Sequence, residues 1–156
     1  MIAKKKTKKL KVVFLANTGW YLYNFRLSLI NFLIKKDFEI HLICPFDDYT
    51  PIIIEKGILV HNWDLKSSST NVFKEINSII SLFRIYRNIK PDLVHHFTIK
   101  SVLYGTLIAN FCGTKFVFNS ITGLGTVFLS NKLKDKFLNF LIIPIYKLII
   151  KTSKSN

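Results

Sequence analysis

The sequence contains little cysteine, glycine and proline, and it has no internal repeat. Its 156 residues include two cysteines, six glycines and four prolines. Cys44 and Cys112 show no CxxC or Cys/His ligand spacing, so neither a disulfide framework nor a zinc site is indicated. Each lies in an apolar neighbourhood, so we expect both to be reduced core residues. The lysine-rich start is the one low-complexity segment.

The sequence also lacks an apolar run long enough to cross a membrane. The longest apolar stretch, 137–150, covers about fourteen residues and contains an asparagine, a proline and a lysine, whereas a transmembrane helix needs about twenty. The apolar run at 12–16, after the basic start, is too short for the hydrophobic region of a signal peptide, and no small-residue cleavage site follows it. We therefore expect a cytoplasmic protein.

Acidic residues are few, and the chain is strongly basic. Lysine and arginine total 23 against nine acidic residues, which gives a formal net charge of +14. Such an excess favours nucleic acid, phospholipid headgroups or a diphosphate-bearing substrate. The lysines cluster at the two ends while the aromatic residues lie in apolar runs, so the interleaving typical of nucleic-acid stacking is missing. We expect no nucleic-acid partner.

Short apolar runs alternate with segments of helical periodicity. The runs predicted to form strands are 10–16, 38–44, 58–63, 93–97 and 115–120. The predicted helices have their inner faces at Leu22, Phe25, Leu29, Phe32 and Leu33, then at Ile76, Ile79, Ile80 and Phe83, and then at Val102, Leu103, Leu107 and Ile108. This alternation predicts an α/β fold, a Rossmann-like parallel sheet with helices on both faces.

The expected organisation is a basic segment (1–9), one α/β domain (10–130), and an amphipathic helix with a polar tail (131–156). Pro144 is expected to kink that helix. Its apolar face has two candidate occupants, an anionic membrane interface or a second domain.

In parallel sheets of this kind, ligands bind at the carboxyl ends of the strands. The loops expected there are 17–20, 45–49, 66–71, 98–100 and 122–126, and their hydroxyls, amides, lysine and glycines suit a sugar or a diphosphate. We expect one edge of the sheet to gather Thr18, Gly19, Thr98, Lys100, Thr122, Gly123 and Gly125.

Three of these loops offer groups for an anion. The helix that begins near Gly19 presents unpaired N–H groups and carries Asn24 and Arg26; the alternative is a tight turn with an ordinary exposed arginine. Lys100 at a strand tip suits a phosphate. The glycines at 123–125 free backbone N–H groups, although a sharp turn explains them equally well.

Other kinds of chemistry find little support. His95 and His96 are adjacent on a strand and point to opposite sides, so they do not suit one metal ion; the alternative role for one of them is core packing with a hydrogen bond to backbone. Asp47 and Asp48 fit a solvated turn. No Ser/His/Asp motif and no GxGxxG fingerprint is present.

Five strings carry a resemblance to a known family. They are WYLYNFR at 20–26, PFDDY at 45–49, KPD at 90–92, HFTIK at 96–100 followed by Tyr104 and Gly105, and ITGLGTVF at 121–128. In this order and spacing, the chain resembles the N-terminal, acceptor-side domain of bacterial family 4 glycosyltransferases. The closer match is the subgroup that extends lipid-linked oligosaccharides for surface polysaccharides, lipopolysaccharide among them.

The resemblance implies the GT-B architecture, in which the first Rossmann-like domain holds the acceptor and the second holds the nucleotide sugar through a glutamate pair. Implied acceptor-binding residues are Thr18, Gly19, Asn24, Arg26, Asp47, Thr98, Lys100, Tyr104, Thr122, Gly123 and Gly125. No catalytic residue, metal or cofactor is assigned. The loop 122–126 lacks the histidine that many members carry, and 66–69 lacks an expected arginine.

Taken as a whole, the chain contains no donor half, so the expectation is a truncated or split enzyme that is inactive alone. Its expected partners are a polyprenyl-diphosphate-linked acceptor, the anionic inner face of the plasma membrane and a separate donor-domain chain. The alternatives are a non-catalytic interaction remnant and a basic nucleic-acid-binding module.

Overall fold

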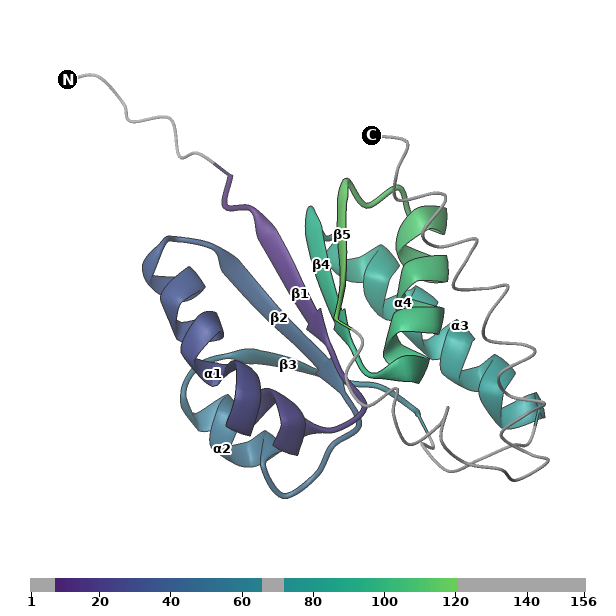
Figure 1. Ribbon diagram of the computed structural model, residues 1–156, viewed down its shortest axis with the longest axis horizontal. Helices are drawn as coiled ribbons and strands as arrows, with labels where there is room; N and C mark the ends of the chain where they lie inside the picture. Colours follow the sequence, from purple (N-terminus) through teal and green to yellow (C-terminus); the bar gives the residue numbers. More distant parts are fainter. Residues whose placement is uncertain (1–7, 66–71, 121–156) are drawn as a thin grey trace.

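The computed structural model describes residues 8–65 and 72–120, which form a parallel β-sheet covered by helices (Figure 1). The strand order is β3-β2-β1-β4-β5, and every neighbouring pair is parallel. The strands are β1 (Lys11–Leu15), β2 (Glu39–Cys44), β3 (Leu59–Asn62), β4 (Leu93–Phe97) and β5 (Phe116–Ser120). The helices are α1 (Gly19–Lys35), α2 (Thr50–Glu55), α3 (Val72–Ile89) and α4 (Ile99–Phe111). The predicted fold class is confirmed.

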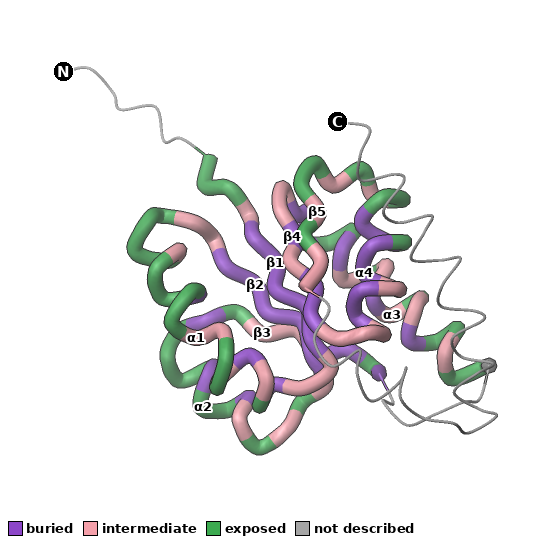
Figure 2. The backbone as a smooth tube through the Cα atoms, in the orientation of Figure 1, coloured by how far each residue is buried: buried purple, intermediate pink, exposed green. Residues whose placement is uncertain are grey.

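Alternating residues of the strands build two cores, one on each face of the sheet. On β1, Val12 and Phe14 pack into the cluster that contains Leu22 of α1, whereas Val13 and Leu15 pack into the opposite cluster, with α3 and α4. The buried central strands of Figure 2 lie between these two layers. Burial on both faces explains why the strands read as continuous apolar runs.

The short helix α2 was not expected from the sequence. Residues 45–57 contain turn-forming residues and no helical repeat of useful length. In the structure Pro51 stands in the first turn of α2, where a proline N–H is not needed. Thr50 and Ile53 of this helix are buried, whereas Ile52 and Ile54 are exposed.

The sequence predicted the wrong inner face for α3: the buried face is rotated from the predicted one by part of a turn. Ile76 and Ile80 are exposed at 47% and 41% of their surface, whereas Ile79 and Phe83 are half-buried. The buried stripe consists of Ser78, Leu82, Tyr86 and Ile89. Two of these side chains are polar and satisfied by hydrogen bonds, so a count of apolar residues could not locate the stripe.

The expected inner face of α1 is only partly correct. Leu22 is buried and Leu33 packs against the core, but Phe25, Leu29 and Phe32 are exposed. Ile30 takes the second fully buried position. Apolar residues occur all around α1, so periodicity alone did not fix its orientation.

On α4, Val102 and Ile108 are buried and Leu103 half-buried as expected, whereas Leu107 is exposed.

Two further observations concern thiols and membrane spans. Both cysteines are free, with Cys44 buried and Cys112 half-buried.

Among the described residues, no helix combines the length and hydropathy that crossing a bilayer requires. The segment 131–156, expected to form an amphipathic helix, lies outside the described residues.

Candidate functional site at the carboxyl edge of the sheet

The register of the strands brings several of the predicted residues to the same edge. Leu15 is level with Ile43 and His96, and Phe97 is level with Ser120. The chain segments that follow these strand ends carry Thr18, Gly19, Asp47, Thr98 and Lys100. Of the predicted residues, Thr122, Gly123 and Gly125 lie outside the described residues.

The N-terminus of α1 is capped from two directions. The Thr18 hydroxyl accepts a hydrogen bond from the backbone N–H of Tyr21 at 3.1 Å. Asp47 reaches across from the loop after β2, and its Oδ2 accepts from the backbone N–H of Trp20 at 2.8 Å. A Cβ at Gly19 would collide with Asp47 Oδ1, so this approach requires glycine. The carboxylate of Asp47 therefore occupies the anion-binding end of α1.

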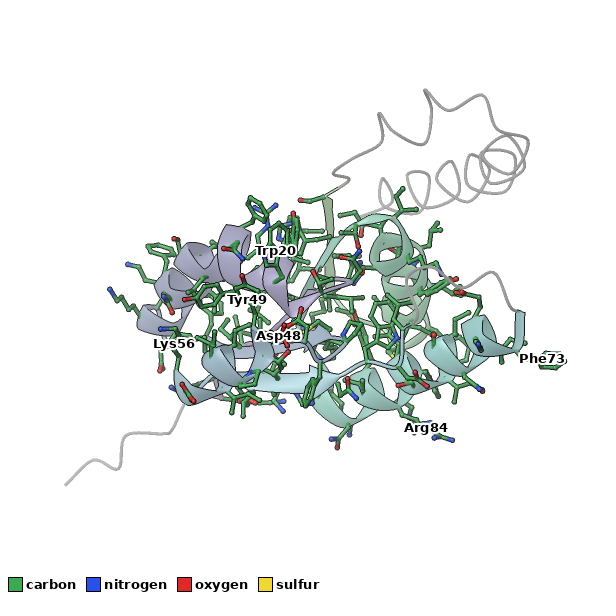
Figure 3. All side chains as sticks on the ribbon, turned by 90° about the horizontal axis from the view of Figure 1, so that it is seen from below. Trp20, Asp48, Tyr49, Lys56, Phe73 and Arg84 are labelled. Atoms are coloured by element: carbon green, nitrogen blue, oxygen red, sulfur yellow. The ribbon has the colours of Figure 1, made fainter. Side chains whose placement is uncertain are left out.

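Asp47 also organises its own loop. Its Oδ1 accepts from the backbone N–H of Tyr49 at 3.1 Å and from the Thr50 hydroxyl at 3.0 Å. Trp20 of α1 and the loop residues Asp48 and Tyr49 are labelled in Figure 3. The interpretation as a solvated turn holds for the exposed Asp48 but not for Asp47. Asp47 acts in this structure as a link between the first two loops of the edge.

Lys100 and Tyr104 share a carboxylate that sequence reasoning missed. Glu75 of α3 pairs with Lys100, whose Nζ lies 2.8 Å from Oε1, and accepts a hydrogen bond from the Tyr104 hydroxyl at 2.5 Å on Oε2. Burial, and then the Glu75 carboxylate, raise the pKa of Tyr104 well above its usual value. A phosphate that approached Lys100 would have to compete with Glu75.

Thr98 begins α4 in a conformation that side chains rarely adopt. Its φ of 72° and ψ of 157° lie in a region used mainly by glycine. Such a conformation costs roughly 1–3 kcal/mol and persists only where the surroundings enforce it, which is typical of functional sites. The Thr98 hydroxyl lies 3.2 Å from the hydroxyl of Ser101 in the first turn of α4.

Arg26 is a half-buried cation held between aromatic rings. Its guanidinium carbon lies 4.4 Å from the ring centroid of Phe97, the last residue of β4, and 5.2 Å from that of Tyr21. Nη2 donates to the Tyr21 hydroxyl at 2.6 Å, and Nε is buried without a hydrogen-bond partner. Arg26 is therefore not the ordinary exposed arginine of the alternative interpretation. Asn24, by contrast, is exposed and bonds to the backbone of Trp20.

The two adjacent histidines point to opposite faces, as predicted. His95 lies on the α1 side, where its ring packs at a tilt against Phe97 with centroids 4.1 Å apart and its Nε2 lies 2.7 Å from the Ser120 hydroxyl. Burial, and then the positive charge of Arg26, lower the pKa of His95 to about 4. This imidazole is consequently neutral at pH 7.

His96 lies on the other face, fully buried in a network of side chains. Its Nδ1 lies 2.8 Å from Oδ1 of Asn119, and its Nε2 lies 2.9 Å from the Tyr86 hydroxyl. Because Oδ1 only accepts, Nδ1 carries the proton and Nε2 accepts from Tyr86. Burial lowers the pKa of His96 to about 4. The expected hydrogen bond to backbone is thus replaced by hydrogen bonds to side chains.

One cavity lies beside the loop after β2, and another lies at the opposite edge of the sheet. One, of about 530 Å³, adjoins the loop after β2 and has Asp48 and Glu55 in its lining, so it does not suit an anion. Another, of about 490 Å³, lies at the amino ends of β4 and β5 and is lined by Lys90 and Lys115 among others. Neither of these two cavities contains Arg26.

Solved structures share this fold. MurG from Acinetobacter baumannii matches with a TM-score of 0.56 at 18% identity, over 72% of this chain and 34% of its own. A glycosyltransferase from Rickettsia africae matches with a TM-score of 0.55 at 16% identity, over 71% of this chain and 29% of its own. A UDP-N-acetylglucosamine 2-epimerase matches with a TM-score of 0.54 at 19% identity, over 72% and 33% of the two chains. At these identities the likeness shows the Rossmann-like fold of GT-B proteins.

Sequence comparison is more specific. The chain is 27% identical, over 142 residues, to the N,N'-diacetylbacillosaminyl-diphospho-undecaprenol alpha-1,3-N-acetylgalactosaminyltransferase of Campylobacter jejuni. This match covers 91% of the chain and 38% of that relative, so the chain spans less than two fifths of the relative's length. A family model described as glycosyl transferase 4-like matches residues 11–155. The chain belongs to the glycosyl transferase 4-like family.

Proposed function

We propose that this chain is the acceptor-binding half of a glycosyltransferase that moves a sugar from a nucleotide sugar to a polyprenyl-diphosphate-linked glycan. The product would serve surface polysaccharide synthesis. The observation that carries this proposal is the match, over 91% of the chain, to a relative named for a diphospho-undecaprenol-linked sugar.

The geometry of the carboxyl edge supports a role in acceptor binding. Arg26 and the Thr98 hydroxyl are a cation and a polar group of the kinds that bind a diphosphate and a sugar. The described residues contain three glutamates. Glu39 begins β2 and Glu55 ends α2, so both lie away from the carboxyl edge, and Glu75 alone cannot form a pair there. The resemblance assigns such a pair to the nucleotide-sugar half.

Catalysis in this proposal requires a second domain. In a GT-B enzyme the reaction takes place between two domains, and the residues that the structure describes, 8–65 and 72–120, form one sheet with its helices. Taken by themselves, they are proposed to bind an acceptor but to transfer no sugar. A donor domain, on the same or on a separate chain, would supply the nucleotide sugar.

Isothermal titration calorimetry with the purified chain tests this division of roles. We expect saturable binding of a short-chain prenyl-diphosphate N-acetylhexosamine and no saturable binding of a UDP-N-acetylhexosamine. A prenyl alcohol of the same length is the control for apolar adsorption. Saturable binding of the nucleotide sugar without binding of the prenyl-diphosphate sugar would contradict the proposal. So would sugar transfer by the chain alone when both substrates are present.

We also propose that the chain works at an anionic membrane surface, where a polyprenyl-linked acceptor resides. Support comes from the net charge of +14 and from the lysines of the segment 1–9. Each lysine near an anionic surface contributes about 1 kcal/mol, screened over about 8 Å at physiological salt. Flotation with phosphatidylglycerol vesicles should therefore be strong at low salt and weak at high salt, with phosphatidylcholine vesicles as the control. Absence of flotation at low salt would contradict this proposal.

A further inference from the structure

Among the described residues of the carboxyl edge, Arg26 is a cation that has no acidic partner. Lys100 is paired with Glu75, and the N-terminus of α1 already holds the carboxylate of Asp47. Within 8–65 and 72–120, Arg26 forms no ion pair. Its Nε is moreover buried without a hydrogen-bond partner. A charged donor in this state is poorly solvated, and an anion that supplied an acceptor oxygen would stabilise it.

The guanidinium of Arg26 is also held in one orientation before any ligand arrives. The Phe97 ring supports its plane at 4.4 Å, and the Tyr21 hydroxyl accepts from Nη2 at 2.6 Å. Within the described ranges, Nη1 has one long contact of 3.4 Å, with the Phe25 carbonyl, and so retains donor capacity. A planar donor group that is fixed in this way binds an oxyanion at a smaller loss of side-chain entropy than a free lysine.

Neutral polar groups surround this cation on the same face of β4. The His95 ring packs at a tilt against the same Phe97 ring, and its Nε2 lies 2.7 Å from the Ser120 hydroxyl. His95 of β4 lies near enough to Arg26 for the positive charge to act on its pKa, and neither His95 nor Ser120 of β5 adds a negative charge. Arg26, His95 and Ser120 thus offer a cation, an imidazole and a hydroxyl on one face of the sheet, a combination that suits a phosphate group.

We propose that Arg26 binds a phosphate oxygen of the diphosphate-bearing substrate, and that Tyr21 and Phe97 are positioning residues for its guanidinium. This inference rests on the proposed function, because that function supplies the diphosphate. The shared chemistry is a diphosphate, which the lipid-linked acceptor and the nucleotide sugar both carry.

Binding of three probes to four variants of the chain tests the inference. The probes are inorganic pyrophosphate, farnesyl diphosphate and UDP, and the variants are Arg26→Gln, Arg26→Lys, Arg26→Ala and the control Arg84→Gln. Arg84 is exposed on the opposite layer, in α3 (Figure 3). We expect Arg26→Gln to weaken diphosphate binding at least about tenfold, as expected for the loss of a charge-assisted hydrogen bond. Arg84→Gln should leave it within about twofold, because an exposed charge acts weakly at a distance.

Two further readouts separate ligand binding from a structural role. Guanidinium ion added at millimolar concentration should restore binding to Arg26→Ala but not change the control, since it refills the emptied site. Arg26→Lys keeps the charge and should bind more weakly than the wild type, because it loses the planar pair of donors. If Arg26→Gln does not fold, Arg26→Lys and the rescue of Arg26→Ala decide the question.

The outcomes separate this inference from the proposed function. If Arg26→Gln weakens the binding of farnesyl diphosphate but not of UDP, the result supports both the inference and the proposed function. If it weakens the binding of UDP alone, the result supports the phosphate-binding role of Arg26 and contradicts acceptor binding. Equal diphosphate binding by the wild type and Arg26→Gln overturns the inference, even where the wild type binds the prenyl-diphosphate sugar. Restoration of binding by guanidinium supports it, and binding that guanidinium leaves unrestored in a folded Arg26→Ala overturns it.

Discussion

Replacement of Gly105 by alanine is expected to lower the free energy of unfolding by about 3 kcal/mol, the upper range for overpacking a core. A Cβ at this position would lie 2.6 Å from Leu15 Cδ2 and 2.7 and 2.8 Å from ring atoms of His96. Neither neighbour can easily move, because Leu15 is fully buried in β1 and His96 is hydrogen-bonded on both ring nitrogens. The close approach of α4 to the sheet therefore depends on glycine.

The sign of the stability change in Gly105→Ala distinguishes close packing from helix propensity. Helix propensity alone predicts that Gly105→Ala stabilises α4 by about 1 kcal/mol. Urea unfolding followed by circular dichroism measures the difference, and Asn110→Ala, at an exposed position of the same helix, is the control. The control should change the stability by less than about 0.5 kcal/mol. A Gly105→Ala variant as stable as the wild type would show that α4 does not pack as described.

Acid is expected to destabilise the fold through His96. The pKa of His96 falls from 6.5 to about 4 in the folded chain because of its burial. Above pH 6.5 the imidazole is neutral in both states. Between pH 6.5 and about 4 the unfolded chain binds a proton that the folded chain does not, so the stability falls as the pH falls. Below about pH 4 the folded chain also binds the proton, and the loss levels off at about 3 kcal/mol.

Urea unfolding at pH 7.5 and at pH 4.5 measures this loss, and a His96→Gln variant isolates the contribution of this residue. The variant should be less stable than the wild type at pH 7.5, because glutamine does not reproduce the hydrogen bonds to Tyr86 and Asn119. Its stability should nevertheless change less between the two pH values. An equal pH dependence in both proteins would contradict a buried, neutral His96.

The sheet was predictable because its strands are short apolar runs bounded by glycine, proline or polar residues. Burial on both faces produces such runs, and the helical segments between them require parallel pairing. The orientation of α1 and α3 was not predictable. Phe25 of α1 is exposed although it is apolar, and Ser78 and Tyr86 of α3 are buried although they are polar. Only tertiary packing decides such cases.

The placement of the candidate residues at the carboxyl edge could be predicted from the sequence, but their contacts could not. The strand-end loops identified Lys100, because ligand sites in parallel sheets occupy that edge, and the resemblance added Asp47. Their partners lie far away in sequence: Glu75 is 25 residues from Lys100, and Trp20 is 27 residues from Asp47. No local sequence pattern indicates such pairs of residues. Arg26 was identified from its place on the helix after the first strand-end loop and from the resemblance, whereas the aromatic rings that hold it are visible only in the fold.

The position of a bound acceptor on the chain tests the central claim most directly. Amide NMR shifts can be followed while a short-chain prenyl-diphosphate N-acetylhexosamine is added. The account predicts that shifts concentrate at the carboxyl edge, in the segments 16–20 and 97–101 and at Ser120. Shifts confined to the opposite edge, at 90–92 and 113–115, would contradict it, and so would the absence of any shift at saturating acceptor.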